Sequence, residues 1–178
     1  MDIFKVINTR HSYRGEFTDE PVGRADLVKI VNAGICAPSG KNCQTTEFVI
    51  VDDREKLQSI GSMHTMPAMR TAKAMILCII PYKPETVYEG HSFAVEDCSA
   101  AVENMFLAIT ALGYASVWID GWLRVCDRAR MIGDIIGLCA DKKVRVLLPI
   151  GVPSDKITQA EKKPFIERCW FNMYRSEP

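Results

Sequence analysis

The sequence predicts a single domain, spanning residues 1–178, in which α-helices pack around a β-sheet. Its composition is that of an ordinary globular protein, with 48% apolar and 25% charged residues. Short apolar runs lie between longer stretches with helical spacing, and this combination indicates both kinds of element. No repeat, linker or low-complexity run interrupts the chain, so nothing in the sequence divides it into parts.

The chain begins with two predicted helices and a strand. Residues 2–9 offer apolar contacts on a short helix, and residues 24–36 carry apolar side chains at helical spacing. Pro38 stops the second helix, because proline cannot continue the hydrogen-bond pattern. Residues 48–51, Phe-Val-Ile-Val, are a predicted strand.

A short helix and a fully buried strand are predicted next. Residues 53–60 form the helix, and Gly61 can close it. Residues 74–80 are an unbroken apolar run ended by Pro81, which predicts a strand covered on both faces. The same run is too short to cross a bilayer as a helix.

The second half of the chain is predicted to alternate helices and strands. A long helix over residues 92–112 is followed by a strand over 115–119. A helix over residues 127–136, with Asp127 as its N-cap, leads to a strand over 143–148.

The helix predicted over residues 92–112 is apolar almost all round. One row has steps of three and four residues: Val95, Cys98, Val102, Met105, Ile109 and Leu112. A row of alanines repeats every seven residues: Ala94, Ala101 and Ala108. Such a helix is buried on all sides, either in the core of one chain or between two subunits, and we favour the second arrangement.

Charge and cysteine usage argue against several classes of protein. With 22 basic and 22 acidic residues, nucleic-acid binding by bulk charge loses its main support. The seven cysteines are odd in number and include no Cys-x-x-Cys pair, so we expect neither disulfides nor a metal cluster, and most thiols are predicted to pack as small apolar groups. The N-terminus lacks the apolar core of a signal peptide, so a reducing cytoplasm is expected.

Arg10-His11-Ser12-Tyr13-Arg14 is the first candidate binding segment. If it is extended, residues 10, 12 and 14 project from one side. Two guanidinium groups and a hydroxyl suit a phosphate or another anion. The alternative is a solvated charged loop, and this segment alone favours that alternative.

The second candidate segment runs from Ala37 to Gln44. Pro38, Ser39 and Gly40 predict a turn that exposes backbone polar groups. Asn42 and Gln44 are two residues apart, so both amides could face a ligand edge that mixes donors and acceptors. An ordinary polar turn after a helix is the alternative.

Two further segments carry candidate residues near the end of the chain. Gly121 follows a predicted strand and permits close backbone approach to a ligand, whereas Asp120 could be only a turn residue. Lys162 and Lys163 could reach an anion or form a solvated face.

The order and spacing of these segments resemble the nitroreductase family of flavoproteins. The resemblance rests on Arg-x-Ser-x-Arg at residues 10–14, Ala-Pro-Ser-x-x-Asn-x-Gln at 37–44, and the alanine-rich central helix. It continues through residues 112–119 and 148–153 to a basic residue before Pro164. Together these pieces cover the chain from Ile7 to about Phe165.

The resemblance implies an α+β fold with a mixed central sheet flanked by helices, in an intertwined homodimer with two FMN molecules at the interface. Arg10, Ser12 and a terminal lysine would hold the FMN phosphate, and Arg14 would reach the ribityl chain or the flavin N1/O2 side. Asp120 and Gly121 would place backbone groups near flavin N5. The full set of implied cofactor-binding residues is Arg10, His11, Ser12, Arg14, Pro38, Ser39, Asn42, Gln44, Asp120, Gly121, Lys162 and Lys163, with Pro38 and Ser39 serving the partner's flavin.

The implied activity is hydride transfer from NAD(P)H, through bound FMN, to a nitroaromatic, a quinone or a similar small acceptor in ping-pong fashion. The chemistry resides in the flavin, so no catalytic side chain is expected, and His11, His64 and His91 are too scattered for a metal site. A binding module without turnover, serving as a sensor or carrier, and a structural homodimer without cofactor are the alternatives.

The chain is short for this family, which implies a reduced lid over the substrate pocket. Residues 61–72 and 82–92 are left to form one, although local packing is the more common role of such segments. Cys43 lies inside a cofactor segment, and we expect it to be a buried thiol.

Overall fold

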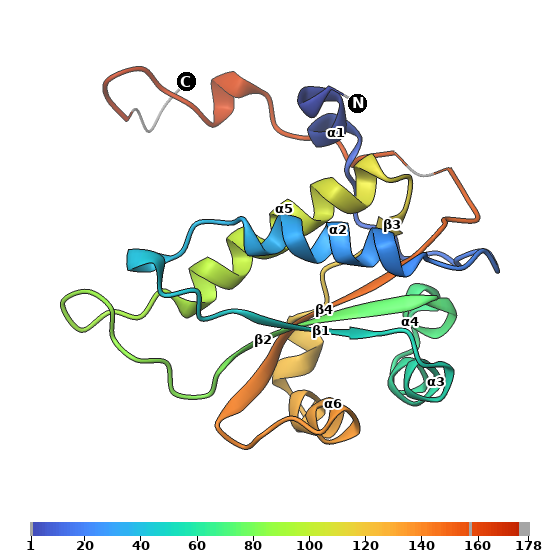
Figure 1. Ribbon diagram of the computed structural model, residues 1–178. Helices are drawn as coiled ribbons and strands as arrows, with labels where there is room; N and C mark the ends of the chain where they lie inside the picture. Colours follow the sequence, from blue (N-terminus) through green and yellow to red (C-terminus); the bar gives the residue numbers. More distant parts are fainter. Residues whose placement is uncertain (1, 157, 175–178) are drawn as a thin grey trace.

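A four-stranded sheet separates two layers of helices in the computed structural model, which describes residues 2–156 and 158–174 (Figure 1). The strands, in their order across the sheet, are β1 (Glu47–Val51), β2 (Ala74–Pro81), β4 (Lys142–Gly151) and β3 (Ala115–Ser116). All three neighbouring pairs are antiparallel. An isolated parallel bridge joins Ser12 to Ser116 beside β3. The α+β fold expected from the sequence is confirmed.

The helices divide between the two faces of the sheet. Their bounds are α1 (Ile3–Thr9), α2 (Arg24–Ile35), α3 (Arg54–Ser62), α4 (Pro67–Thr71), α5 (Ala94–Ala111) and α6 (Arg128–Ile136). Three short 3-10 turns are η1 (Gly40–Asn42), η2 (Gly121–Arg124) and η3 (Phe165–Glu167). Figure 1 shows α2 and α5 above the sheet and α3, α4 and α6 below it.

Alternation along β2 explains the two layers. Met75, Leu77 and Ile79 belong to the core cluster on the α3, α4 and α6 side, because successive side chains of a strand point to opposite faces. The residues between them belong to the cluster under α2 and α5: Ala74, Ile76, Cys78 and Ile80. The strand is therefore buried on both faces, as its unbroken apolar run predicts.

Helix α5 is buried along one side in the single chain and exposed along the other. Most of the predicted apolar row is buried, namely Cys98, Val102, Met105 and Ile109, whereas Val95 is exposed. Ala101 approaches α2 at Gly34, where an added Cβ would lie 2.9 Å from the Met105 side chain. Close contact of α2 and α5 thus depends on small residues at the crossing.

Several element boundaries differ from the sequence predictions. Helix α3 continues through Gly61 to Ser62, and the carbonyl of Met69 packs where a Gly61 Cβ would stand, so that position has no space for a side chain. Asp127 precedes α6 with φ 55°, and its side chain makes no cap hydrogen bond. Strand β3 covers only two residues, after which a single bridge joins Ile119 to Leu147.

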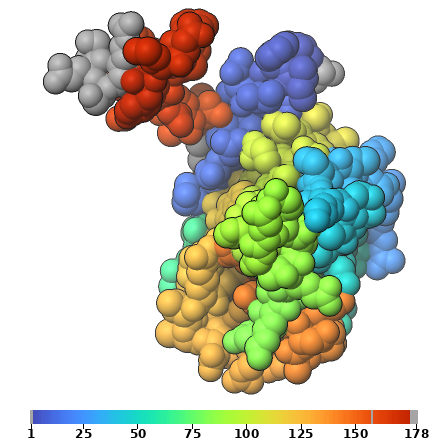
Figure 2. All heavy atoms as spheres, turned by 90° about the vertical axis from the view of Figure 1, so that its left-hand side faces the viewer, coloured from blue at the N-terminus to red at the C-terminus, as the bar shows by residue number. Residues whose placement is uncertain are grey.

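The C-terminal segment, residues 158–174, leaves the body of the molecule (Figure 2). Gln159 anchors its start by donating hydrogen bonds to the carbonyls of Ile7 and Arg10, at 3.3 and 2.8 Å. The segment then exposes large apolar side chains: Phe165, Ile166, Phe171, Met173 and Tyr174. Helix α1 beside it likewise exposes Ile3, Phe4 and Ile7.

The prediction that most thiols pack as small apolar groups is wrong. Cys78 and Cys98 are buried in the core, but the other five thiols are exposed: Cys36, Cys43, Cys126, Cys139 and Cys169. They lie at helix ends and in turns, just outside the apolar runs that suggested burial. Within the described part of the chain, no helix combines the length and hydropathy needed to cross a bilayer.

Candidate functional site

Tyr13 fixes the orientation of the Arg10–Arg14 segment. Its side chain is fully buried, its ring centroid lies 5.2 Å from that of Phe17, and its hydroxyl donates to the Glu16 carbonyl. The Tyr13 backbone nitrogen donates to the Ser116 carbonyl at 2.8 Å. Because side chains alternate in an extended segment, the buried tyrosine leaves Ser12 and Arg14 facing away from the core.

Arg10 connects this segment to the end of β3 through two aromatic rings. Its guanidinium carbon lies 5.7 Å from the Phe106 ring centroid, and the Phe106 ring stacks on Trp118 with centroids 6.4 Å apart and an interplanar angle of 14°. The nearest carboxylate contact is a loose one to Glu103 at 3.7 Å. The side chain is only 19% exposed, so packing orients a guanidinium whose donors are not fully engaged.

The carboxylate of Asp120 is held by two arginines. It accepts hydrogen bonds of 2.7 and 2.6 Å from Arg124 and a further bond from Arg145. Burial by itself raises the pKa of Asp120, but the bonds and charges of both guanidinium groups outweigh it and hold the pKa below its usual value. The side chain therefore has a structural role, and only its backbone remains to contact a ligand.

Gly121 offers open space next to this backbone. A Cβ added there would meet no atom within 4 Å, so the fold itself does not require glycine at this position. A glycine that the surrounding chain does not need is consistent with a ligand that approaches the main chain.

We call the candidate residues of the segment after α1 and of the segment from β3 to η2 the Arg10 cluster: Arg10, His11, Ser12, Arg14, Ser116, Asp120 and Gly121. Two of these residues have buried polar atoms without partners in the part of the chain that the structure describes. His11 Nε2 and Ser116 Oγ are buried and have no hydrogen-bond partner among the described residues. Such groups are normally satisfied in a native structure. Together with the guanidinium of Arg10 and the hydroxyl of Ser12, they fit a phosphate-bearing ligand with further polar groups.

The second predicted segment folds into a tight turn, as Pro38, Ser39 and Gly40 predict, and the 3-10 turn η1 lies within it. Lys41, Asn42 and Gln44 have φ values of 47°, 57° and 50°, which are left-handed conformations that non-glycine residues rarely adopt. The inference that two-residue spacing aligns Asn42 and Gln44 therefore has the wrong geometric basis. The turn itself brings them together, because Gln44 Nε2 lies 3.5 Å from the Asn42 carbonyl oxygen. Cys43 is exposed, contrary to expectation.

Two contacts with the start of α5 hold this turn. The backbone nitrogen of Gly40 donates to Asp97 Oδ1 at 2.9 Å. A Cβ at Gly40 would lie 2.6 Å from the Phe93 ring, so the main chain packs directly on that side chain. Within the turn, the Gln44 nitrogen donates to Ser39 Oγ at 3.0 Å. We call Pro38, Ser39, Asn42, Gln44 and Asp97 the Asp97 cluster.

A cavity of about 360 Å³ borders the Asp97 cluster, with Pro38, Ser39 and Gln44 in its wall. Three oxygens in the same wall are buried and unpartnered among the described residues: Asp97 Oδ2, Thr45 Oγ1 and Thr46 Oγ1. These three oxygens also require polar contacts that the described residues do not supply.

A single chain does not bring the two clusters together. The Arg10 cluster contacts α5 at Phe106, and the Asp97 cluster contacts it nine residues earlier. Nine residues of α-helix span about 13 Å. Figure 1 shows the turn around η1 and the segment after α1 at different ends of α5.

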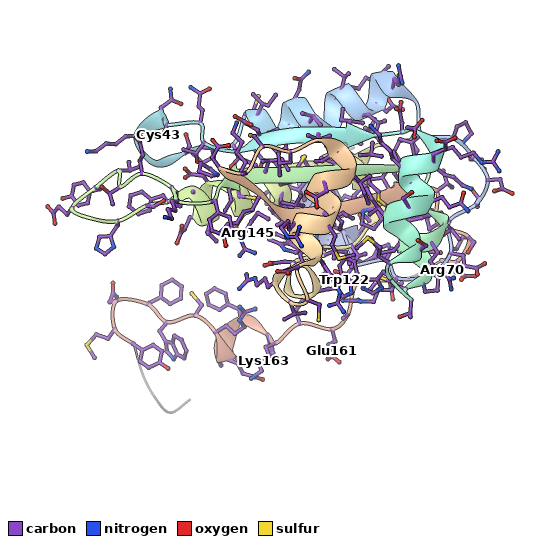
Figure 3. The ribbon with its side chains drawn as sticks, turned by 90° about the horizontal axis from the view of Figure 1, so that it is seen from below. Cys43, Arg70, Trp122, Arg145, Glu161 and Lys163 are labelled. Carbon is purple, nitrogen blue, oxygen red and sulfur yellow. The ribbon has the colours of Figure 1, made fainter. Side chains whose placement is uncertain are left out.

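The lysines of the C-terminal segment are exposed and lie beyond the Gln159 anchor (Figure 3). Lys163 follows that anchor by four residues, so its backbone is at most about 14 Å from Gln159. Because Gln159 donates a hydrogen bond to the Arg10 carbonyl, the segment that carries Lys162 and Lys163 begins next to the Arg10 cluster.

The two segments considered for a lid lie apart and have different roles. Met63 and Met66 pack against the core around α3 and α4, and His64 packs on Trp122 with ring centroids 4.7 Å apart. Burial lowers the pKa of His64, and the charge of Arg128 lowers it further. Tyr82 and Tyr88 are exposed on the loop after β2, and the Lys41 ammonium lies 5.4 Å from the Tyr88 ring centroid.

Sequence reasoning missed three residues that organise the site: Asp97, Ser116 and Arg145. Asp97 carried a usable signal, because an acidic residue on an otherwise apolar helix face must have a partner when it is buried. Arg145 carried a similar signal, because it is a charged residue within an otherwise apolar strand. Among the described residues, no group of three or more His, Cys, Asp or Glu side chains could hold a metal ion.

Comparison with known proteins identifies the family. The model of the nitroreductase family matches residues 7–63 and 62–152. This chain belongs to the nitroreductase family. Over 157 residues it is 32% identical to an Archaeoglobus fulgidus protein with the provisional name NADH dehydrogenase/NAD(P)H nitroreductase, and the match covers 87% of each chain.

Solved structures of nitroreductases have the same fold. One, from Bacteroides thetaiotaomicron and provisionally named an NADH dehydrogenase/NAD(P)H nitroreductase, superposes with a TM-score of 0.82 at 26% identity, covering 97% of this chain and 98% of that one. A nitroreductase with bound FMN from Bacteroides fragilis gives a TM-score of 0.74 at 25% identity, covering 92% and 95%.

Proposed function

We propose that this nitroreductase is an FMN-dependent oxidoreductase that transfers hydride from NAD(P)H to a nitroaromatic, a quinone or a similar small acceptor. One observation carries the proposal: Ser12 pairs with Ser116 of β3, Arg10 packs on Phe106 beside Trp118, and His11 Nε2 and Ser116 Oγ are buried without partners among the described residues. The bound FMN of a structural relative supports the same ligand class.

In this proposal the protein binds and orients the cofactor, with Asn42 and Gln44 binding the ribityl chain and the ring edge. FMN supplies the hydride chemistry when it is bound. Arg10 and Ser12 hold its phosphate, with Lys162 or Lys163 contributing from the C-terminal segment. Arg14, which is exposed on the same side as Ser12, stabilises negative charge on the N1/O2 side. Asp120 and Gly121 contribute main-chain groups near N5.

The proposal requires a homodimer. The Asp97 cluster lies about 13 Å along α5 from the Arg10 cluster, so Pro38 and Ser39 would contact the flavin bound mainly by the partner. The apolar side chains exposed on α1 and the C-terminal segment support this arrangement, because a contiguous apolar surface usually marks an interface.

The kinetic and cellular settings follow from the same proposal. The sequence contains no Gly-x-Gly-x-x-Gly dinucleotide motif, so the reductant and the acceptor would use the same space in turn, with ping-pong kinetics. Five exposed thiols persist in a reducing compartment, which supports a cytoplasmic location.

The visible spectrum tests the proposal directly. Purified protein should be yellow, release FMN on denaturation and lose its colour when NAD(P)H is added without oxygen. A colourless protein that takes up no added FMN contradicts the proposal. Flavin that is bound but never reduced would instead identify a binding module without turnover.

A further inference from the structure

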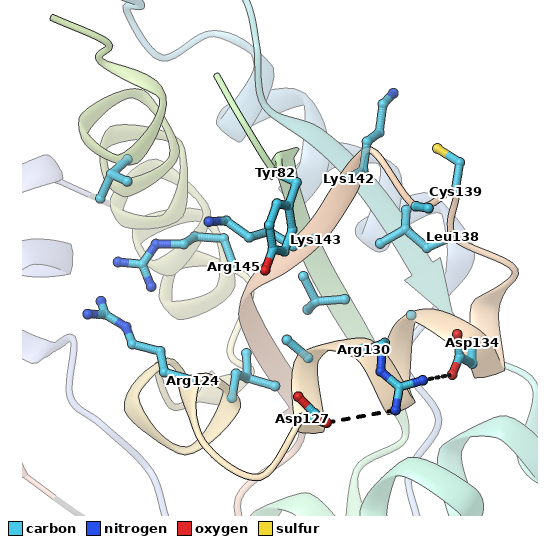
Figure 4. Close-up of a pocket in the computed structure, with 16 residues that line it drawn as sticks. Tyr82, Arg124, Asp127, Arg130, Asp134, Leu138, Cys139, Lys142, Lys143 and Arg145 are labelled. Carbon is cyan, nitrogen blue, oxygen red and sulfur yellow. Dashed lines mark hydrogen bonds and ion pairs between the residues drawn. The ribbon is translucent and has the colours of Figure 1, made fainter. Parts of the chain in front are cut away.

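A cavity of about 660 Å³ lies between the start of β4, η2 and α6 (Figure 4). We call it the Arg145 cavity. Its wall contains no member of the Asp97 cluster, and the Arg10–Arg14 segment does not line it either. Its volume is within the range of pockets that accept small organic molecules.

One end of this cavity has an excess of positive charge. Arg124 and Arg145 share the single carboxylate of Asp120. The Lys143 ammonium lies 5.1 Å from the Tyr82 ring centroid, and no carboxylate in residues 2–156 and 158–174 lies within 4.0 Å of it. Three cations therefore face one anion, and Figure 4 shows the three basic side chains on the same side of the cavity.

The positive charges elsewhere in the wall are compensated. Lys142 contacts Glu47 at 2.5 Å. Arg130 lies between Asp127 at 3.8 Å and Asp134 at 3.4 Å, as the dashed lines of Figure 4 show. The unbalanced charge is thus confined to the Arg124, Arg145 and Lys143 end.

Apolar side chains form much of the remaining wall: Leu123, Ala129, Leu138 and Val144. Such a wall binds an apolar ligand body, and the exposed ring of Tyr82 offers a stacking surface. Guanidinium groups match the planar geometry of a carboxylate. The lining therefore suits an aromatic carboxylate better than a neutral aromatic molecule.

Asp120 belongs to the Arg10 cluster and does not line the cavity, but it is linked to the basic end of the cavity because Arg124 and Arg145 both bind its carboxylate. We propose that the Arg145 cavity binds the carboxylate of an aromatic acceptor, with Lys143 and Arg145 as its specificity-determining residues. This inference rests on the proposed function, because Asp120 and Gly121 mark the edge of the flavin site. An acceptor held by its carboxylate here would extend its ring toward that edge.

Matched acceptors and a single charge removal test the inference. With FMN-loaded protein, Lys143→Gln should raise the KM for 4-nitrobenzoate about five- to tenfold, as expected for one lost charged contact. The KM for nitrobenzene, which has no carboxylate, should change less than twofold. Lys143→Arg should restore most of the difference, and Lys56→Gln, an equal charge change on α3 outside the cavity, should have no effect.

Direct binding separates this inference from the proposed function. Calorimetric titration of 4-nitrobenzoate into the protein, with and without FMN, should give an affinity that Lys143→Gln weakens by the same factor and that salt reduces. Equal binding by wild type and Lys143→Gln overturns the inference even if the protein is an active flavoenzyme. An effect on the KM for NADPH, but not on that for 4-nitrobenzoate, also overturns it and assigns the cavity to the phosphates of the reductant. Failure to bind FMN contradicts the proposed function alone.

Discussion

Asp97 accepts a hydrogen bond of 2.9 Å from the backbone nitrogen of Gly40, a residue 57 positions earlier in the chain. The carboxylate lies on the first turn of α5 and is only 8% exposed. This bond ties the turn that presents Asn42 and Gln44 to the central helix. The hydrogen bond therefore holds the Ala37–Gln44 turn against the start of α5, although the two segments are far apart in the sequence.

Asp97→Ala should destabilise the protein by about 1–3 kcal/mol, because a buried charged hydrogen bond is lost. FMN affinity should fall as well, since the turn loses its anchor. Asp97→Asn keeps an acceptor for the Gly40 nitrogen and should be milder. Urea unfolding and FMN titration measure both effects, with Glu96→Ala as an exposed control on the same turn. An Asp97→Ala protein with unchanged stability would show that the bond is unimportant.

Arg10→Ala should weaken FMN binding about 10- to 100-fold, the range for losing a charged hydrogen bond. Riboflavin has no phosphate, so its affinity should change about threefold or less. Fluorescence titration with both flavins gives the comparison, and Arg54→Ala on α3 serves as the matched control. Equal losses for FMN and riboflavin would place Arg10 away from the phosphate.

Gly121→Ala should weaken FMN binding, whereas Gly151→Ala should lower the free energy of unfolding. At Gly121 a Cβ meets no atom within 4 Å, so the free energy of unfolding should change by about 0.5 kcal/mol or less while FMN affinity falls. At Gly151 a Cβ would lie 2.5 Å from the Phe17 ring, and overpacking should cost about 1–3 kcal/mol. If Gly121→Ala binds FMN normally, no ligand approaches that backbone.

The Asp120 pair predicts a pH-dependent contribution to stability. Because the folded pKa of Asp120 is lowered, its ion pairs stabilise the protein above the unfolded pKa of about 4. That contribution is lost as the pH falls through the lower, folded pKa. Asp120→Asn should therefore be less stable than wild type at pH 7, and the difference should shrink below about pH 4. Denaturant unfolding across this range measures it, and a constant difference would argue against the pair.

Association should depend on the apolar side chains exposed on α1. Phe4 is 70% exposed in the single chain, so Phe4→Glu should shift the mass measured by light scattering from two chains toward one. FMN affinity should decrease in parallel, since the proposed site needs both subunits. Val125→Glu, at another exposed apolar residue, is the control. A wild-type protein that remains one chain at high concentration would contradict the dimer.

The sequence predicts the layers of this fold well and its turns poorly. The apolar run of β2 specifies a strand buried on two faces, because periodicity indicates which side chains are buried. The spacing along α5 specifies a largely buried helix and leaves open whether one chain or two subunits bury it. Helix α4 is five residues long and too short for a periodic signal. The turn after Pro38 is predicted, but the left-handed conformation of Lys41 and Gln44 within it has no signal, because neither lysine nor glutamine is typical of that conformation.

The candidate site shows the same contrast. Arg10, Ser12 and Gly121 could be chosen from motif order, and the structure pairs Ser12 with Ser116 of β3. The contact of Arg124 and Arg145 with the Asp120 carboxylate could not be predicted. Arg145 reaches Asp120 from β4, and β4 pairs with Ile119 only in the folded chain. Long-range pairs of this kind depend on strand register, which local spacing does not encode.

In the proposed site, the left-handed residues of the Ala37–Gln44 turn would trade folding stability for the presentation of polar side chains. A left-handed conformation costs a residue such as Lys41 or Gln44 about 1–2 kcal/mol that glycine would not lose. Replacing them with glycine would relax the backbone of the empty protein and remove the side chains that the turn presents. Screens for thermal tolerance and screens for cofactor retention should therefore select different residues in this turn.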